Sequence, residues 1–130
     1  MIPIDFILLI DDDEATGVFH RIMAEEAGLT DRIYTTQSAE AALKQLTELV
    51  GQDNAKHGLI FLDINMPVHD GWDFLNMLEA SALDAQQFHV IMVSASDHPK
   101  DIDRIMAHPL LKGFEPKPIT SEKILFWADK

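Results

Sequence analysis

The chain has 130 residues, 47% hydrophobic and 25% charged, which is the composition of a single globular domain. Its formal net charge of -12 argues against nucleic acid or an anionic membrane surface as a direct partner, and no apolar run is long enough to insert into a bilayer. The absence of cysteine excludes disulfides, thiolate metal sites and a catalytic thiol, and it fits a reducing, cytoplasmic location.

The N-terminal third alternates between strand and helix patterns. Phe6–Ile10 is continuously apolar, which predicts a strand buried on both faces of a parallel sheet. The next segment, Glu14–Ala27, has Val18, Ile22 and Met23 at helical spacing, which predicts an amphipathic helix. Further strands are predicted over 32–36, 59–62, 89–93 and 111–115, and further helices over 39–50, 73–80, 99–106 and 121–127, with a polar loop over 51–58. Pro99 suits the start of the helix that carries Ile102, Ile105 and Met106.

Five strand–helix units in succession predict an α/β fold. Short connections and right-handed crossovers give a doubly wound five-stranded parallel sheet with helices on both faces. The natural strand arrangement for such units is the flavodoxin-like order 2-1-3-4-5. We expect residues 1–130 to form this one domain, without an attached output domain.

The stretch 59–71 organises the chain. An apolar run ends at Asp63, a turn containing Pro67 follows, and a helical pattern begins at Trp72. Asp63 therefore lies at the carboxyl end of a strand, where open α/β sheets bind their ligands. The alternative is an aspartate that only caps its own loop through the backbone.

Four strand ends of the predicted sheet present Asp11 with Asp12, Asp63, Ser94 and Lys117 at one edge. Three carboxylates so close together repel one another unless a cation neutralises them, and Mg²⁺ prefers such oxygen ligands. A carboxylate can attack phosphorus to form an aspartyl phosphate, with a lysine and a hydroxyl neutralising and binding the phosphoryl oxygens. Singly, each residue could be solvated loop, helix cap or surface lysine. All of them at one sheet edge are much harder to explain by chance.

The chain resembles the receiver domain of two-component response regulators over essentially its whole length. The matching residues are Asp11-Asp12 after Leu8-Leu9-Ile10, Asp63-Ile64-Asn65-Met66-Pro67, Asp70-Gly71, Ser94-Ala95 and Lys117-Pro118. The resemblance implies a phosphoacceptor in a phosphorelay, assisting its own phosphorylation and dephosphorylation but not an enzyme. It also implies a histidine kinase or histidine phosphotransfer protein as phosphohistidine donor, and a downstream protein target.

The same resemblance assigns the site residues. Asp63 would be the phosphoacceptor, and Mg²⁺ would be held by Asp12, Asp63 and the backbone carbonyl of Asn65, with Asp11 helping. Ser94 would bind a phosphate oxygen, and Lys117 would pair first with the carboxylate and then with the phosphate. The Lys117–Pro118 bond is usually cis in this family.

Switching is also implied by the resemblance. Ser94 would move toward the phosphate and Phe114 would turn inward, repacking the face formed by the fourth helix, fifth strand and fifth helix. Ile105 and Trp127 are candidate exposed residues on that face. Phe114 could equally be an ordinary core or edge aromatic.

Two other functions are compatible with parts of the sequence. Asp11-Asp12-Asp13 resembles the motif of haloacid-dehalogenase-type phosphatases, with Asp11 as nucleophile and Asp13 as acid/base, although Ala15 replaces the usual residue. The second alternative is a phosphorylation-independent interaction module with the same fold. His69 and His98 are interpreted as solvated loop residues, because an oxygen-rich site favours a hard cation.

Overall fold

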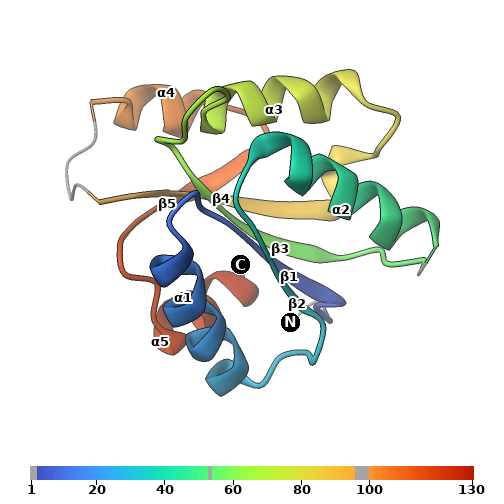
Figure 1. Cartoon of the computed structure of the whole chain (residues 1–130), viewed down its shortest axis with the longest axis vertical. Helices are drawn as coiled ribbons and strands as arrows, with labels where there is room; N and C mark the ends of the chain where they lie inside the picture. The colour runs from blue at the N-terminus through green and yellow to red at the C-terminus, as the bar shows by residue number, and fades with distance from the viewer. Residues whose placement is uncertain (1–2, 53, 96–99) are drawn as a thin grey trace.

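The computed structural model describes residues 3–52, 54–95 and 100–130. Five parallel strands form one sheet in the order β2-β1-β3-β4-β5, with helices on both faces (Figure 1). The strands are β1 (Phe6–Ile10), β2 (Ile33–Thr36), β3 (Gly58–Asp63), β4 (Phe88–Ser94) and β5 (Leu111–Pro116). The helices are α1 (Glu14–Ala27), α2 (Ala39–Gly51), α3 (Gly71–Ala80), the short 3-10 helix η1 (Ala85–Gln87), α4 (Ile102–Ala107) and α5 (Ser121–Ala128). The predicted fold class and strand order are confirmed.

Two hydrophobic cores fill the space between the sheet and its helices. In β1, side chains alternate between the faces, so that Phe6 and Leu8 join one core and Ile7 joins the other. The first core contains residues of α2, α3 and α4, and the second contains residues of α1 and α5, as the two helix layers of Figure 1 indicate. Strands β1, β3 and β4 are buried throughout, as the continuous apolar runs predicted.

Helix α1 turns a different face to the sheet from the one that its apolar spacing predicted. Val18 is 57% exposed and Ile22 is 47% exposed, whereas His20 and Ala24 are buried. Met23 is partly buried and does pack on the second core. The prediction was wrong for Val18 and Ile22 because α1 contacts both the sheet and α5, and the face that it turns to them carries His20 and Ala24.

The face formed by α4, β5 and α5 also differs in detail from the prediction. Ile105 is fully buried in the first core, so it is not an exposed residue of this face, whereas Met106 is 71% exposed. Trp127 is half-buried, and its indole Nε1 donates a hydrogen bond to Glu115 Oε2 at 2.7 Å. The predicted helix start at Pro99 lies outside the described residues, as does His98.

The observed bounds of several elements differ slightly from the predicted ones. Gly51 is the last residue of α2 and Gly58 the first of β3, although both were predicted as loop, and η1 was not predicted. Helix α3 begins at Gly71, where Asp70 and Asp73 each accept a hydrogen bond from the other's backbone N–H in a capping box. Over the residues that the structure describes, none of the helices has the length and apolar character needed to cross a membrane.

Candidate functional site

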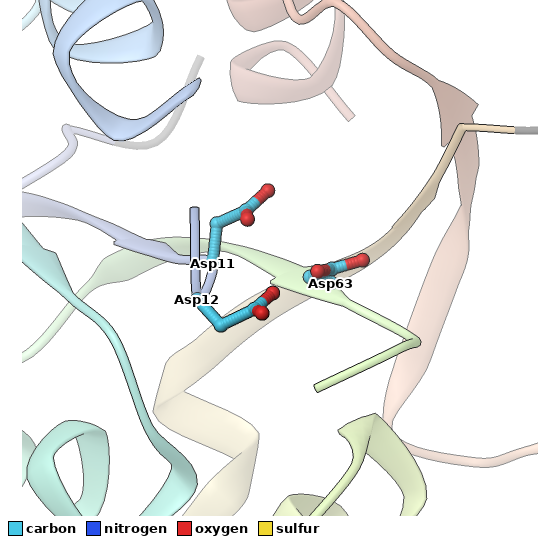
Figure 2. A group of neighbouring side chains, drawn as sticks. All are labelled: Asp11, Asp12 and Asp63. Atoms are coloured by element: carbon cyan, nitrogen blue, oxygen red, sulfur yellow. The ribbon is translucent and has the colours of Figure 1, made fainter. Parts of the chain in front are cut away.

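Three carboxylates converge at the carboxyl edge of the sheet. Asp11 directly follows β1, Asp12 is the next residue, and Asp63 ends β3. Because β1 and β3 are hydrogen-bonded neighbours, one oxygen from each carboxylate lies within 4.8 Å of the others (Figure 2). Asp11 and Asp63 are buried, whereas Asp12 is exposed. The predicted acidic cluster is therefore present, with one side open to solvent.

Lys117 reaches this cluster from the end of β5. Its Nζ lies 2.7 Å from Asp11 Oδ2 and 3.5 Å from Asp63 Oδ2. Its backbone N–H donates to the carbonyl of Ser94 at 2.7 Å, and Ser94 is a buried residue at the end of β4. The N–H of Asn65 donates to Asp63 Oδ1 at 3.3 Å. The structure thus gathers at one edge the site residues that the sequence predicted.

The Lys117–Pro118 peptide bond is cis, as the resemblance implied. Phe114 lies three residues before Lys117, opposite Met92 in the β4–β5 register, and packs half-buried against the first core. It is therefore neither a fully buried core residue nor a fully exposed one.

The site changes the proton affinity of its ionisable groups. Burial, together with the negative charge of Asp11, raises the pKa of Asp63 from 3.8 to about 6, against the opposing effect of Lys117. Burial disfavours the charged form of Lys117, but its hydrogen bond to Asp11 and the attraction of Asp63 outweigh this and raise its pKa. Asp63 is consequently mostly ionised at neutral pH, and the raised pKa of Lys117 keeps its ammonium protonated there.

This pKa shift predicts a pH-dependent stability difference between the wild type and Asp63→Asn without divalent cations. The folded pKa of Asp63, about 6, lies above its ordinary value of 3.8. Its contribution to stability is therefore fully present below the ordinary value and is lost as the pH rises through about 6. After allowance for solvent screening, we expect the Asp63→Asn variant to be more stable than wild type by about 2 kcal/mol at pH 7.5. At pH 4 the advantage should largely vanish; urea unfolding at both pH values measures it, and an equal difference at both would contradict the assignment.

The donor set suits a hard divalent cation. Carboxylate oxygens are the ligands that Mg²⁺ prefers, and the exposed side of Asp12 leaves room for the waters that this ion retains. His69 does not belong to the acidic cluster; its ring nitrogens lie 3.7 Å from Glu40 and 3.8 Å from Asp73 at the surface. This agrees with its interpretation as a solvated loop residue.

Sequence reasoning missed the roles of three residues near the site. Asp13 caps α1, because its carboxylate accepts hydrogen bonds from the backbone N–H and hydroxyl of Thr16. The position of Asp13 just before a helical pattern, with Thr16 in its first turn, was the available signal. Gly71 allows α3 to approach Asp63, and buried His20 contacts the segment that follows β5. Neither contact has a signature in the sequence alone.

Gly71→Ala should destabilise the protein. An added Cβ would lie 2.8 Å from the backbone oxygen of Asp63 and 3.1 Å from the Cα of Ile64, and neither backbone atom can move aside cheaply. We expect a loss of about 1–3 kcal/mol in the free energy of unfolding, measured by urea titration. Gly17→Ala is the matched control, because a Cβ on Gly17 meets nothing within 4 Å. Equal stability of the two variants would contradict the close approach.

Comparisons with known proteins agree on one family. The family model described as response regulator receiver domain matches residues 7–126. A probable C4-dicarboxylate response regulator, DctR, of Halalkalibacterium halodurans is 27% identical over 122 residues, which are 94% of this chain and 49% of that protein. The chain thus spans about half the length of this relative.

Solved structures match nearly end to end. A two-component response regulator from Cytophaga hutchinsonii superposes with a TM-score of 0.87 at 25% identity, covering 98% of this chain and 96% of that one. A response regulator receiver protein from Dyadobacter fermentans gives a TM-score of 0.77 at 22% identity, covering 95% and 97%. The chemotaxis response regulator CheY4 of Vibrio cholerae gives 0.68 at 20%, covering 97% of each. The last two identities speak for the fold alone.

Receiver domains are signalling domains of two-component systems, and they interact with histidine kinases and downstream targets. The pocket formed by Asp11, Asp12 and Asp63 fits the phosphoacceptor site of such a domain. With its five-stranded parallel sheet and with 120 residues matched by the family model, from 7 to 126, this chain belongs to the response regulator receiver domain family.

Proposed function

We propose that the domain accepts a phosphoryl group on Asp63 from the phosphohistidine of a histidine kinase or histidine phosphotransfer protein. The observation that carries this proposal is the setting of Asp63: its buried carboxylate ends a central strand, within reach of two other carboxylates and 3.5 Å from the Lys117 ammonium. A buried carboxylate with one cation beside it, in a cluster that meets solvent at Asp12, is suited to attack phosphorus.

In this step a carboxylate oxygen of Asp63 forms a bond to phosphorus while the phosphorus–nitrogen bond of the donor breaks, and the imidazole leaves. The pKa of about 6 keeps Asp63 mainly ionised, and therefore nucleophilic, at pH 7. Lys117 then offsets the charge that the phosphoryl oxygens bring, and the Ser94 hydroxyl donates to one of them. Asp11, Asp12, Asp63 and the Asn65 carbonyl would hold Mg²⁺, which when bound neutralises both the carboxylates and the phosphoryl oxygens.

The signal would pass to the face formed by α4, β5 and α5. Ser94 ends β4, and Phe114 lies half-buried on the neighbouring strand β5, where a shift of one can change the packing of the other. Ile102 and Met106 on α4 are exposed, which supports a protein target contacting this face. Phosphorylation can bias this face only by its different interaction with two packing states.

A phosphatase of the haloacid-dehalogenase type finds less support. That mechanism needs Asp13 as an acid/base, but its carboxylate accepts two hydrogen bonds from Thr16 as the cap of α1. One sheet with both cores packed on it supports treating residues 1–130 as one receiver domain. The lack of cysteine supports a cytoplasmic location for it.

The test is phosphorylation by acetyl phosphate with and without Mg²⁺, read by intact mass. The proposal expects a phosphoryl mass increment on the wild-type protein that requires Mg²⁺. Beryllofluoride binding, followed by NMR, covers the case of rapid dephosphorylation, because it forms a stable complex at the carboxylate. A folded protein that responds to neither reagent would contradict the proposal and favour the phosphorylation-independent interaction module.

A further inference from the structure

The segment that carries Lys117 has few backbone N–H groups that can anchor it by donating hydrogen bonds. Residues 116–119 read Pro-Lys-Pro-Ile, so that only Lys117 and Ile119 have an N–H to donate. The N–H of Lys117 donates to the carbonyl of Ser94 at 2.7 Å, which ties the segment to β4. The N–H of Ile119 donates to Nε2 of His20 at 2.9 Å, which ties it to α1. Each donor therefore supplies a separate anchor.

His20 is built into the protein as a neutral acceptor. Its side chain is 3% exposed, and burial lowers its pKa below the ordinary value of 6.5, with the positive charges of Lys117 and Lys123 acting in the same direction and Asp11 opposing. Because Nε2 accepts from Ile119, the proton of the neutral ring resides on Nδ1. This buried imidazole, 99 residues from Ile119 in the sequence, links α1 to the lysine segment.

Packing holds the Ile119 end of the segment, because the Ile119 side chain is fully buried in the second core, but it leaves open space beside Lys117 and Pro118. An open cavity of about 420 Å³ lies there, and its lining includes Phe19, His20, Ala95, Lys117 and Pro118. On the other side, Lys123 of α5 donates from Nζ to the carbonyls of Pro116 and Pro118, both at 3.1 Å. The segment is thus held by the buried side chain of Ile119, by hydrogen bonds from α5 to its carbonyls, and by the one hydrogen bond to α1, in which His20 accepts the Ile119 N–H.

We propose that His20 is a positioning residue for Lys117: by accepting the Ile119 N–H, it holds the segment so that the ammonium stays between Asp11 and Asp63. This inference rests on the proposed phosphoacceptor function, because the position of Lys117 matters for phosphoryl transfer. Through His20, helix α1 contributes to phosphoryl transfer although His20 does not contact the reacting atoms. Loss of this acceptor leaves the segment held through Ser94, Lys123 and the buried Ile119 side chain, but it removes the hydrogen bond on the side of the cavity, toward which Lys117 can then shift.

The experiment compares His20→Leu, which fills space without an acceptor, with His20→Gln, whose carboxamide can place an acceptor near Nε2. The rate of phosphorylation by acetyl phosphate with Mg²⁺ should fall about tenfold in the Leu variant and stay within about twofold of wild type in the Gln variant. Thermal unfolding identifies the temperature at which each variant is fully folded. If the Leu variant does not fold, His20→Asn replaces it, because its shorter side chain cannot reach Ile119.

A double-mutant cycle with Lys117→Met separates positioning from a general structural effect. If His20 acts through Lys117, His20→Leu should change the residual rate by less than about twofold once the lysine is absent. If His20→Leu still slows phosphorylation about tenfold in the Lys117→Met background, the inference is overturned. So would equal rates for the Leu and Gln variants.

The NMR signal of the Lys117 ammonium can be measured without phosphorylation, so it tests the positioning role of His20 separately from the proposed function. The short contact with Asp11 should shift the NMR signal of the Lys117 ammonium nitrogen and protect its protons from exchange with water. The signal should be preserved in His20→Gln and lost or broadened in His20→Leu. If wild type takes no phosphoryl group but this pattern holds, the proposed function fails and the positioning role stands. An unchanged signal in the Leu variant would overturn the positioning role.

Discussion

Asp63→Asn is expected to abolish Mg²⁺-dependent phosphorylation by acetyl phosphate. The carboxamide lacks the nucleophilic oxygen anion, and removing one of three clustered carboxylates also weakens the cation site. The protein should fold, because the substitution removes a buried charge whose pKa is already raised. Intact mass should show no phosphoryl increment under conditions in which wild type is modified.

The matched control for this loss is Asp31→Asn, which makes the same chemical change at an exposed position outside the acidic cluster. It should take up phosphate like wild type. Asp11→Asn should weaken the cation site without removing the phosphoacceptor. An adduct that survives in Asp63→Asn and disappears in Asp11→Asn would contradict the assignment and favour Asp11 as the nucleophile of a phosphatase-like site.

Lys117→Met should slow phosphorylation by about 100-fold, the usual effect of deleting one preorganised electrostatic partner of a reacting group. Methionine keeps much of the side-chain volume but removes the cation that lies 2.7 Å from Asp11 and 3.5 Å from Asp63. The two buried carboxylates then face each other without compensation, so the pKa of Asp63 should rise further above its ordinary value. Initial rates with acetyl phosphate and saturating Mg²⁺ measure the slowing of phosphorylation.

Lys112→Met is the control for this second variant, since Lys112 lies on β5, the strand that Lys117 directly follows, but is exposed to solvent. Its phosphorylation rate should match that of wild type. If both lysine variants slowed the reaction equally, the cause would be the net charge of the acidic protein and not the local pairing at Lys117.

The parts of the fold that were predictable are those in which one segment alone carries the signal. The continuous apolar runs of β1 and β3 predicted burial on both faces, and their abrupt ends at Asp11 and Asp63 predicted which side chains would meet. Strand order then followed from connection rules, without any knowledge of tertiary contacts. The acidic site could be predicted because parallel strands place their ends at one edge.

The parts that could not be predicted depend on contacts between distant segments. Val18 and Ile22 have correct helical spacing, yet the face that α1 buries is set by packing against the sheet and α5, and it includes His20. Val68 is exposed and has a left-handed φ of 67°. Because β-branched residues usually avoid this conformation, the sequence does not predict it. The fit of Gly71 against Asp63 depends on how closely α3 approaches the end of β3.

The strand order also determines when, during synthesis, the negative charges of Asp11 and Asp63 gain a cationic partner. Strands β1 and β3 are neighbours, so a nascent chain that has released its first half can already bring Asp11 and Asp63 together. Their cationic partner, Lys117, emerges only with the last strand, which adds at the edge of the sheet beside β4. If β1 and β3 pair before β5 is added, Asp11 and Asp63 lie side by side without Lys117, and their repulsion at neutral pH is not offset. Docking of the final strand relieves this repulsion as it buries apolar surface, which favours the complete domain over its truncated intermediates.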